Sequence, residues 1–156
     1  MSRPPTSLIA LSLLALAGGA RGVTFRVTSF ADEVDAAPGD GACVTLSGDC
    51  SLRAAIQEAN ALPGPDDVTL PAGTYTLTLA GGAEDAAVTG DLDITDSIAI
   101  AGAGPATTTV TGGAGFDDRI VDIRAPPAAQ VTISGLTVSG GRPPAEIGRA
   151  SCRERV

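Results

Sequence analysis

The sequence has no histidine and no tryptophan, and all 10 basic residues are arginines, so lysine is also missing from its 156 residues. Without histidine, the chain can form neither a Ser-His-Asp nor a Cys-His catalytic centre, and it offers no imidazole ligand to a metal ion. The arginines face 18 acidic residues, which gives a net charge of -8. An acidic chain of this kind is a poor partner for phosphate backbones, so we expect no nucleic-acid partner.

Long apolar runs are scarce, and the one that stands out lies at the N-terminus. Met1–Arg3 is short and positive, Leu8–Ala17 is apolar apart from one serine, and Gly18–Ala20 supplies small residues. This pattern predicts a secretory signal peptide over residues 1–20, cleaved after Ala20 or alternatively after Ala17 or Gly22. The run has about half of the roughly 20 residues that span a bilayer, which disfavours a membrane anchor. We therefore expect an exported protein, extracellular or on a bacterial cell surface, with no transmembrane segment.

Residues 146–156 differ abruptly in composition from those before them. They hold three of the 10 arginines and the third cysteine, Cys152. We predict that they are the translation of a sequencing adapter and are not native, the alternative being a natural basic tail. On this prediction the native protein continues past about Ala145, and the chain is an N-terminal fragment. Residues 21–145 then carry six arginines against 16 acidic residues, and their net charge of -10 favours cations over anionic partners.

The other two cysteines, Cys43 and Cys50, are separated by six residues. In an exported chain this pair predicts a disulfide that closes a small loop. Zinc is the competing interpretation, but two thiolates without histidine are too few ligands for a closed zinc site. The bridge is expected to be structural and to fix the approach to the next element.

That next element is the clearest helical pattern in the chain. Apolar residues recur at helical spacing and form one stripe: Leu52, Ala55, Ile56, Ala59 and Leu62. Ser51 is a good N-cap residue, and the Pro63–Asp67 segment ends the pattern. The polar residues between the stripe positions are expected mostly on the opposite face. We predict that Leu52, Ala55, Ile56 and Ala59 cap the β-structure that follows.

After the helix, the chain reads as one short strand after another. Eight β-branched, alternating segments are bounded by glycine or aspartate turns: 68–70, 74–79, 92–94, 98–100, 107–111, 120–123, 131–133 and 136–138. No helical pattern lies between them, which leaves a sandwich, a barrel or a solenoid. Very short strands, recurrent glycine turns and few aromatic residues favour the solenoid. The predicted fold is therefore an all-β parallel β-helix with a helical cap and a truncated C-terminal end.

Several motifs together resemble a known family. They are Gly41-Ala-Cys43, Gly48-Asp-Cys-Ser-Leu-Arg-Ala-Ala-Ile-Gln-Glu-Ala-Asn60, Leu70-Pro-Ala-Gly-Thr-Tyr-Thr-Leu77 and Gly90-Asp-Leu-Asp-Ile94. They resemble the CSLREA domain of bacterial exported proteins, over roughly Thr24 to Gly141. The resemblance implies a right-handed parallel β-helix of pectin-lyase-like type behind an N-terminal cap, in a surface or secreted protein. The family usually has glutamate where this chain has Ala54, so no role of that acid transfers.

Acidic residues are the remaining candidates for chemistry. Asp91 and Asp93 flank Leu92, so alternation puts both carboxylates on one face of a strand, where they can bind calcium or act in acid–base catalysis. We favour the plainer interpretation, a solvated outer face. Asp117 and Asp118 are expected in a turn, with a local ion pair to Arg119. Asp66 and Asp67 are expected as turn residues, and the acids between residues 32 and 40 as a polar loop that offers a weak calcium site.

Two functions of different classes fit these observations. The first is a non-catalytic secreted or cell-surface module, structural or adhesive, that binds an unidentified surface or matrix ligand. The alternative is a polysaccharide-active lyase or hydrolase whose catalytic part lies beyond the C-terminal end of the chain, by analogy at the level of the fold. The lack of lysine and of an exposed aromatic series favours the first. We assign no catalytic, cofactor-binding or metal-binding residue and expect no cofactor, calcium being the one candidate.

Overall fold

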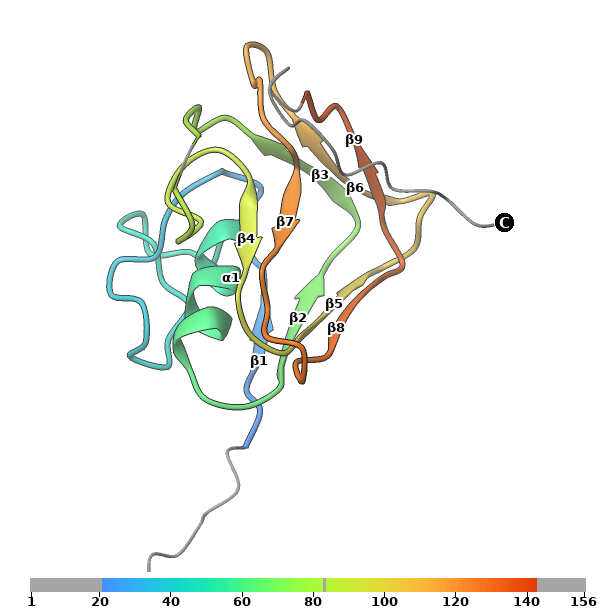
Figure 1. The fold of residues 1–156 in the computed structure, drawn as a ribbon. Helices are drawn as coiled ribbons and strands as arrows, with labels where there is room; N and C mark the ends of the chain where they lie inside the picture. Colours follow the sequence, from blue (N-terminus) through green and yellow to red (C-terminus); the bar gives the residue numbers. More distant parts are fainter. Residues whose placement is uncertain (1–20, 83, 143–156) are drawn as a thin grey trace, which may run out of the picture.

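A computed structural model of the chain describes residues 21–82 and 84–142. The predicted signal peptide, the predicted adapter translation with Cys152 and the predicted C-terminal truncation lie outside these residues. One helix and nine strands occur in the described part (Figure 1). They are β1 (Thr24–Arg26), α1 (Leu52–Ala61), β2 (Asp66–Leu70), β3 (Gly73–Leu77), β4 (Leu92–Ile94), β5 (Ile98–Gly102), β6 (Thr108–Gly112), β7 (Val121–Ile123), β8 (Val131–Ser134) and β9 (Thr137–Ser139).

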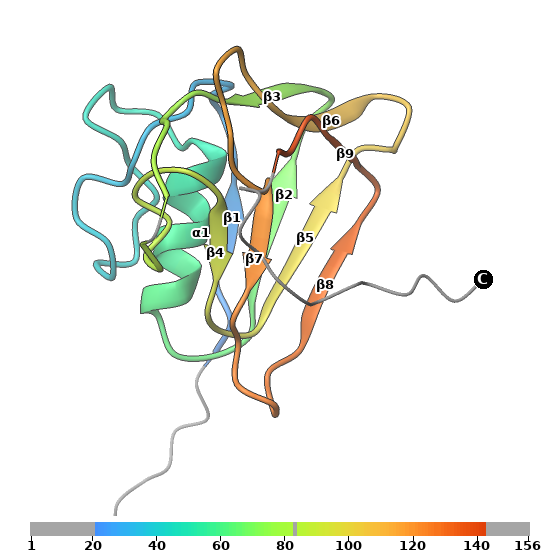
Figure 2. The same cartoon turned by 45° about the horizontal axis from the view of Figure 1, so that its top comes forward.

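The strands pair in parallel and form three small sheets. Their orders are β1-β2-β5-β8, β3-β6-β9 and β4-β7, so the chain visits the three sheets in turn (Figure 2). The register stacks like residues on one another: Val68 lies opposite Ile100, and Ile100 lies opposite Ile133. Equivalent positions of successive strands therefore share one face.

The apolar core lies between the sheets and the helix. Alternation within each strand points every second residue inward, as in β2, where Val68 and Leu70 are buried and Thr69 between them is partly exposed. Helix α1 packs against β2 and β4. Its predicted stripe is buried as expected, with Leu52, Ala55, Ile56 and Ala59 at most 4% exposed.

Local signals explain where the helix begins and ends. The Ser51 side chain accepts a hydrogen bond from the backbone N–H of Ala54 at 3.0 Å, which confirms the predicted N-cap. At the other end, the N–H of Leu62 bonds the carbonyl of Glu58 at 3.0 Å before Pro63 stops the helix. Each of the eight strand segments predicted from the sequence overlaps an observed strand. Strand β1 was not predicted, although Phe25 in it is buried between two exposed residues.

The predicted fold class is wrong. The described residues form three small parallel sheets with one short helix, and no closed solenoid. Nor is there an N-terminal capping helix in the described part, because strand β1 precedes α1 and pairs with β2. Loops fold over the other face of α1 as well, where Arg53, Gln57 and Glu58 are buried, so the helix lies inside the fold and does not close one end of it.

Candidate functional site

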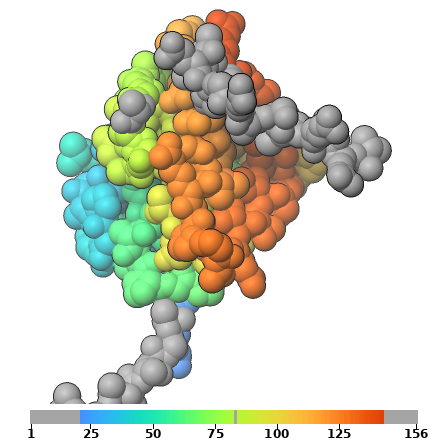
Figure 3. Space-filling view, viewed as in Figure 1, coloured from blue at the N-terminus to red at the C-terminus, as the bar shows by residue number. Residues whose placement is uncertain are grey.

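Three carboxylates meet on the outer side of the β4–β7 sheet. Asp91 directly precedes β4, Asp93 lies within β4, and Asp122 is the β7 residue paired with Asp93. One oxygen of each lies within 4.8 Å of one oxygen of each of the others. In the space-filling view, the loop before β4 adjoins the segment that contains β7 on this face (Figure 3). We call these three residues the carboxylate cluster.

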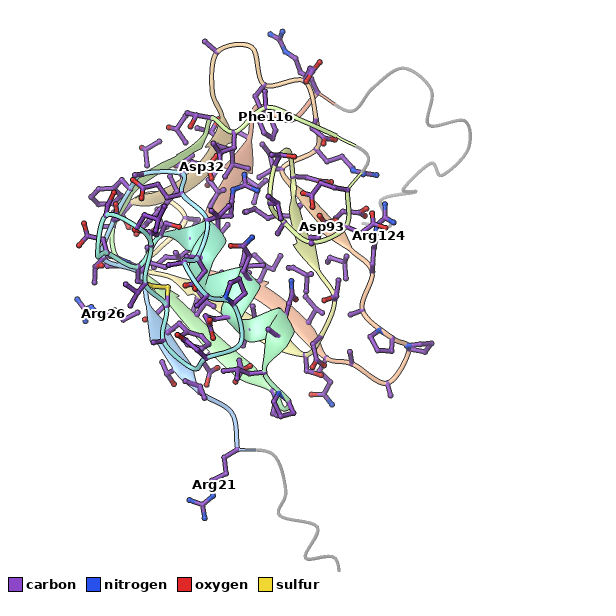
Figure 4. All side chains as sticks on the ribbon, turned by 90° about the vertical axis from the view of Figure 1, so that its left-hand side faces the viewer. Arg21, Arg26, Asp32, Asp93, Phe116 and Arg124 are labelled. Carbon is purple, nitrogen blue, oxygen red and sulfur yellow. A yellow bond between two sulfur atoms is a disulfide. The ribbon has the colours of Figure 1, made fainter. Side chains whose placement is uncertain are left out.

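Two arginines from the β7 region cover the carboxylate cluster. Arg119 Nε lies 2.9 Å from Asp91 Oδ2, and its Nη2 lies 3.3 Å from Asp122 Oδ2. Arg124 Nε lies 2.7 Å from the same Asp122 oxygen and 3.9 Å from Asp93 Oδ1 (Figure 4). Both arginines are partly exposed, at 35% and 45% of their side chains. The cluster therefore lies just beneath the surface, under two guanidinium groups.

The carboxylates are more buried than the sequence predicts. Alternation correctly places Asp91 and Asp93 on one side of the strand, but they are only 3% and 0% exposed instead of solvated. The loop before β4 folds back over them, and the N–H of Ala87 donates to Asp93 Oδ2 at 3.1 Å. A strand pattern cannot reveal such a cover, because it comes from a loop.

Burial changes the acidity of the cluster. Loss of hydration raises the pKa of Asp93 to about 6, although the bond from the Ala87 N–H works in the opposite direction. Burial also raises the pKa of Asp91, and the hydrogen bond from Arg119 partly offsets it. Asp93 Oδ1 is buried and has no hydrogen-bond partner, since 3.9 Å to Arg124 is too long for a hydrogen bond.

Asp122 was not among the predicted site residues. The signal that identifies it is a repeated tripeptide: Leu92-Asp-Ile94 and Val121-Asp-Ile123 have the same apolar-Asp-Ile pattern. Like tripeptides stack on each other in the parallel register, so their aspartates become neighbours. The predicted local ion pair of Arg119 is present but long, 3.9 Å to Asp118, and Arg119 bonds Asp91 more closely.

Helix α1 uses its polar side chains to hold loops. Arg53 is 0% exposed and forms an ion pair with Asp32 at 2.6 Å. Its Nη groups also donate to the carbonyls of Ala87, Gly90 and Asp91, at 2.8–3.2 Å. Arg53 thus links the N-terminal loop to the loop that covers the carboxylate cluster.

The next polar residues of the helix act in the same way. Gln57 accepts from the N–H of Asp35 at 2.7 Å and donates to the carbonyl of Ala87 at 3.1 Å. Glu58 accepts from the N–H groups of Gly39 and Gly41. Asn60 donates to the carbonyl of Asp93 at 2.7 Å and accepts from the N–H of Thr95 at 2.8 Å, so it fixes both ends of the Asp93–Thr95 segment.

The predicted disulfide between Cys43 and Cys50 is present, with the two Cα atoms 5.1 Å apart (Figure 4). It closes the loop that leads into α1, as expected. Within residues 21–82 and 84–142, no helix has the length and apolar character that crossing a bilayer requires. A disulfide is typical of proteins outside the reducing cytoplasm.

The other acidic candidates do not form a site. Asp35 accepts from the N–H groups of Ala37 and Val44, and Asp40 accepts from that of Ala42, so each shapes its own turn. The structure does not gather the acids of residues 32–40 into a metal-sized group. Asp66 is at the start of β2 instead of in a turn, and it is buried.

Two adjoining hollows flank Arg26 on a different part of the surface. Each has a volume of about 260 Å³; Thr69 and Ala101 line one, and Thr28 and Phe30 line the other. Phe30 is 52% exposed, and its ring contacts that of Tyr75 at a centroid distance of 5.1 Å. The ion pairs among the described residues are made by other arginines, so the exposed guanidinium of Arg26 is available to a ligand (Figure 4).

Comparison of the chain with family models, with curated proteins and with solved structures gave no significant match. The resemblance to the CSLREA domain therefore stays a prediction from the sequence.

Proposed function

We propose that this chain is a non-catalytic module of an exported protein, secreted or on the cell surface, that binds a ligand at the hollows beside Arg26. One observation carries the proposal: the accessible hollows and the carboxylates do not coincide. Of three hollows in the described part of the chain, the two beside Arg26 are lined by no carboxylate and the third by one, Asp85. Hydrolysis of a glycosidic bond typically uses a pair of carboxyl groups that flank the bond.

The carboxylate cluster supports the same conclusion. Arg119 and Arg124 bond the Oδ2 atoms of Asp91 and Asp122, and the guanidinium groups lie between these carboxylates and the solvent. A substrate would have to displace both arginines before it reached Asp93, the carboxyl group whose pKa of about 6 suits proton transfer. That pKa is the one observation in favour of the alternative, a polysaccharide lyase or hydrolase.

A neutral polysaccharide of the cell surface or matrix fits the Arg26 hollows best. Guanidinium N–H groups donate to sugar hydroxyls, and the exposed ring of Phe30 offers an apolar face for stacking. The negative charge of the whole chain repels a polyanion. Selectivity for neutral over acidic sugars follows.

The test is binding of the full chain to soluble β-glucan and galactomannan, with polygalacturonate as the acidic comparison, by titration calorimetry. We expect binding to at least one neutral polymer and a loss of at least tenfold in R26Q and in F30A. R21Q is the matched control, since Arg21 is also exposed, and we expect its affinity to stay within twofold. Equal weakening in R21Q and R26Q would refute the assignment to these hollows.

The same mixtures are assayed for new reducing ends and for unsaturated products. We expect neither, and turnover that is abolished in D93N would refute the non-catalytic proposal in favour of the enzyme.

A further inference from the structure

The three carboxylates of the cluster bind their protein partners through one oxygen each. Asp91 and Asp122 use Oδ2 for the arginines, and Asp93 uses Oδ2 for the Ala87 N–H. Their Oδ1 atoms are outside these bonds. Of these atoms, Asp93 Oδ1 is buried without a hydrogen-bond partner, and the Asp93 side chain is 0% exposed.

This oxygen lies beside Arg124, which also bonds Asp122 of the cluster. The charged atom beside it is Arg124 Nε, 3.9 Å away, which itself bonds Asp122 Oδ2 at 2.7 Å. A buried polar atom without a partner costs free energy, typically about 1–3 kcal/mol. An oxygen held in such a position points to a ligand that supplies the missing interaction.

The charged groups around the oxygen indicate whether that ligand is a cation or an anion. Five carboxylates lie within 4.0 Å of the two guanidinium groups: Asp85, Asp91, Asp93, Asp118 and Asp122. Two positive charges cannot neutralise five negative ones. The excess is negative, and the ligand is therefore a cation.

We propose that Asp91, Asp93 and Asp122 bind one calcium ion. Calcium takes oxygen ligands at about 2.3–2.6 Å, so two oxygens on one ion lie up to roughly 5 Å apart, and the 4.8 Å limit of the cluster fits. The three carboxylates supply fewer than the 6–8 ligands that calcium takes, and water completes the set. We expect a Kd of about 0.1–1 mM, the range found for calcium sites of extracellular modules.

Bound calcium gives the site a structural role. It joins β4 to β7 through Asp93 and Asp122, and it holds the loop of Ala87 in place through the Asp93 carboxylate that this loop caps. The site is separate from the Arg26 hollows, so the inference stands independently of the proposed ligand.

The test is titration of calcium chloride into the chelator-treated full chain at pH 8, followed by calorimetry. We expect one ion per chain, with binding at least tenfold weaker in D93N and D122N. D66N is the matched control, because Asp66 is also buried and its Oδ2 also lacks a partner, but it lies outside the cluster. Absence of binding by the unmodified chain at 10 mM calcium overturns the proposal, and so does an equal loss in D66N.

Thermal unfolding separates binding from damage to the fold. In chelator we expect D93N to melt at or above the temperature of the unmodified chain, since an ionised buried carboxylate is removed. In 10 mM calcium the unmodified chain is expected to gain several degrees and D93N none. Should D93N not fold, D122N gives the same readout, since its side chain is partly exposed. Equal gains in all variants overturn the proposal.

Discussion

Arg53 is a fully buried charge whose donors are all directed at oxygen atoms. Its partners are the carboxylate of Asp32, whose side chain is 1% exposed, and the carbonyls of the loop before β4. Asp32 in turn accepts from the N–H groups of Thr78 and Leu79. Removal of one member of such a buried pair leaves the other charge without compensation.

We therefore predict that R53M lowers the free energy of unfolding by about 3–5 kcal/mol. The measurement is chemical denaturation in chelator, followed by circular dichroism. R21M is the control, because Arg21 is exposed, and it should change stability by less than about 0.5 kcal/mol. A loss below about 1 kcal/mol in R53M would show that the buried pair is not needed.

The buried carboxyl group of Asp66 leads to a prediction about how stability depends on pH. It accepts from the N–H of Val23 through Oδ1, but burial dominates and raises the pKa of its carboxyl group. The unfolded chain then loses this proton near the ordinary pKa of about 3.9, whereas the folded chain keeps it to a higher pH. Between the two values the unfolded state binds fewer protons, so the contribution of Asp66 to stability falls as pH rises.

D66N removes this titration. We expect the free energy of unfolding of D66N to fall less between pH 4 and pH 7 than that of the unmodified chain, measured by urea denaturation in chelator. D67N is the control, because Asp67 is exposed, and its pH profile should match that of the unmodified chain. Identical profiles for D66N and the unmodified chain would contradict the raised pKa.

At the scale of elements, the loop between β1 and α1 is held by bonds from the helix and by the disulfide. Glu58 and Gln57 fix its backbone, and the Cys43–Cys50 bridge closes it across a sequence separation of 7. The loop leaves large apolar side chains exposed, namely Phe30, Val44 and Leu46. Cross-links therefore replace a core in this part of the chain.

We predict that the C43S/C50S double variant loses about 2.5 kcal/mol of stability, the value that the chain-entropy relation gives for so short a loop. Urea denaturation with and without dithiothreitol measures it. The reductant should destabilise the unmodified chain by a similar amount and leave the double variant unchanged. A reductant effect that persists in the double variant would show that another reaction is responsible.

At the scale of the whole molecule, α1 connects the sheets. Ile56 is 0% exposed and lies in the interior together with Leu92 of β4, Ile100 of β5 and Val110 of β6, one strand from each sheet. The sheets are small, with four, three and two strands in the described part of the chain. The stability of each sheet thus depends on packing with the other two around Ile56, and we expect the three sheets to unfold together.

I56A tests this expectation. Truncation of a buried isoleucine costs about 2–5 kcal/mol, and the loss should appear equally in two probes, far-ultraviolet circular dichroism and the fluorescence of Tyr75, the one tyrosine of the chain. Coincident midpoints indicate a single cooperative transition. L46A, at an exposed leucine, should have almost no effect. Separate midpoints in I56A would show that the sheets unfold independently.

Much of the local structure could be predicted from the sequence. Ser51 and Pro63 mark the two ends of the helix, the apolar stripe selects its buried face, and short alternating segments give eight of the nine described strands. The Cys43–Cys50 pair followed from counting cysteines. Of the carboxylate cluster, the sequence indicated Asp91 and Asp93 and the side of the strand that they share, but it placed them in solvent.

What the sequence determined by itself depends on neighbours within one turn or one strand, since caps, stripes and alternation are local. The tertiary structure decided the rest. The parallel register placed Asp93 opposite Asp122, and loop packing buried the polar face of α1 around Arg53. It also arranged the strands as three small sheets in place of the expected β-helix. These features depend on turn lengths and on contacts between distant segments, which no local pattern encodes.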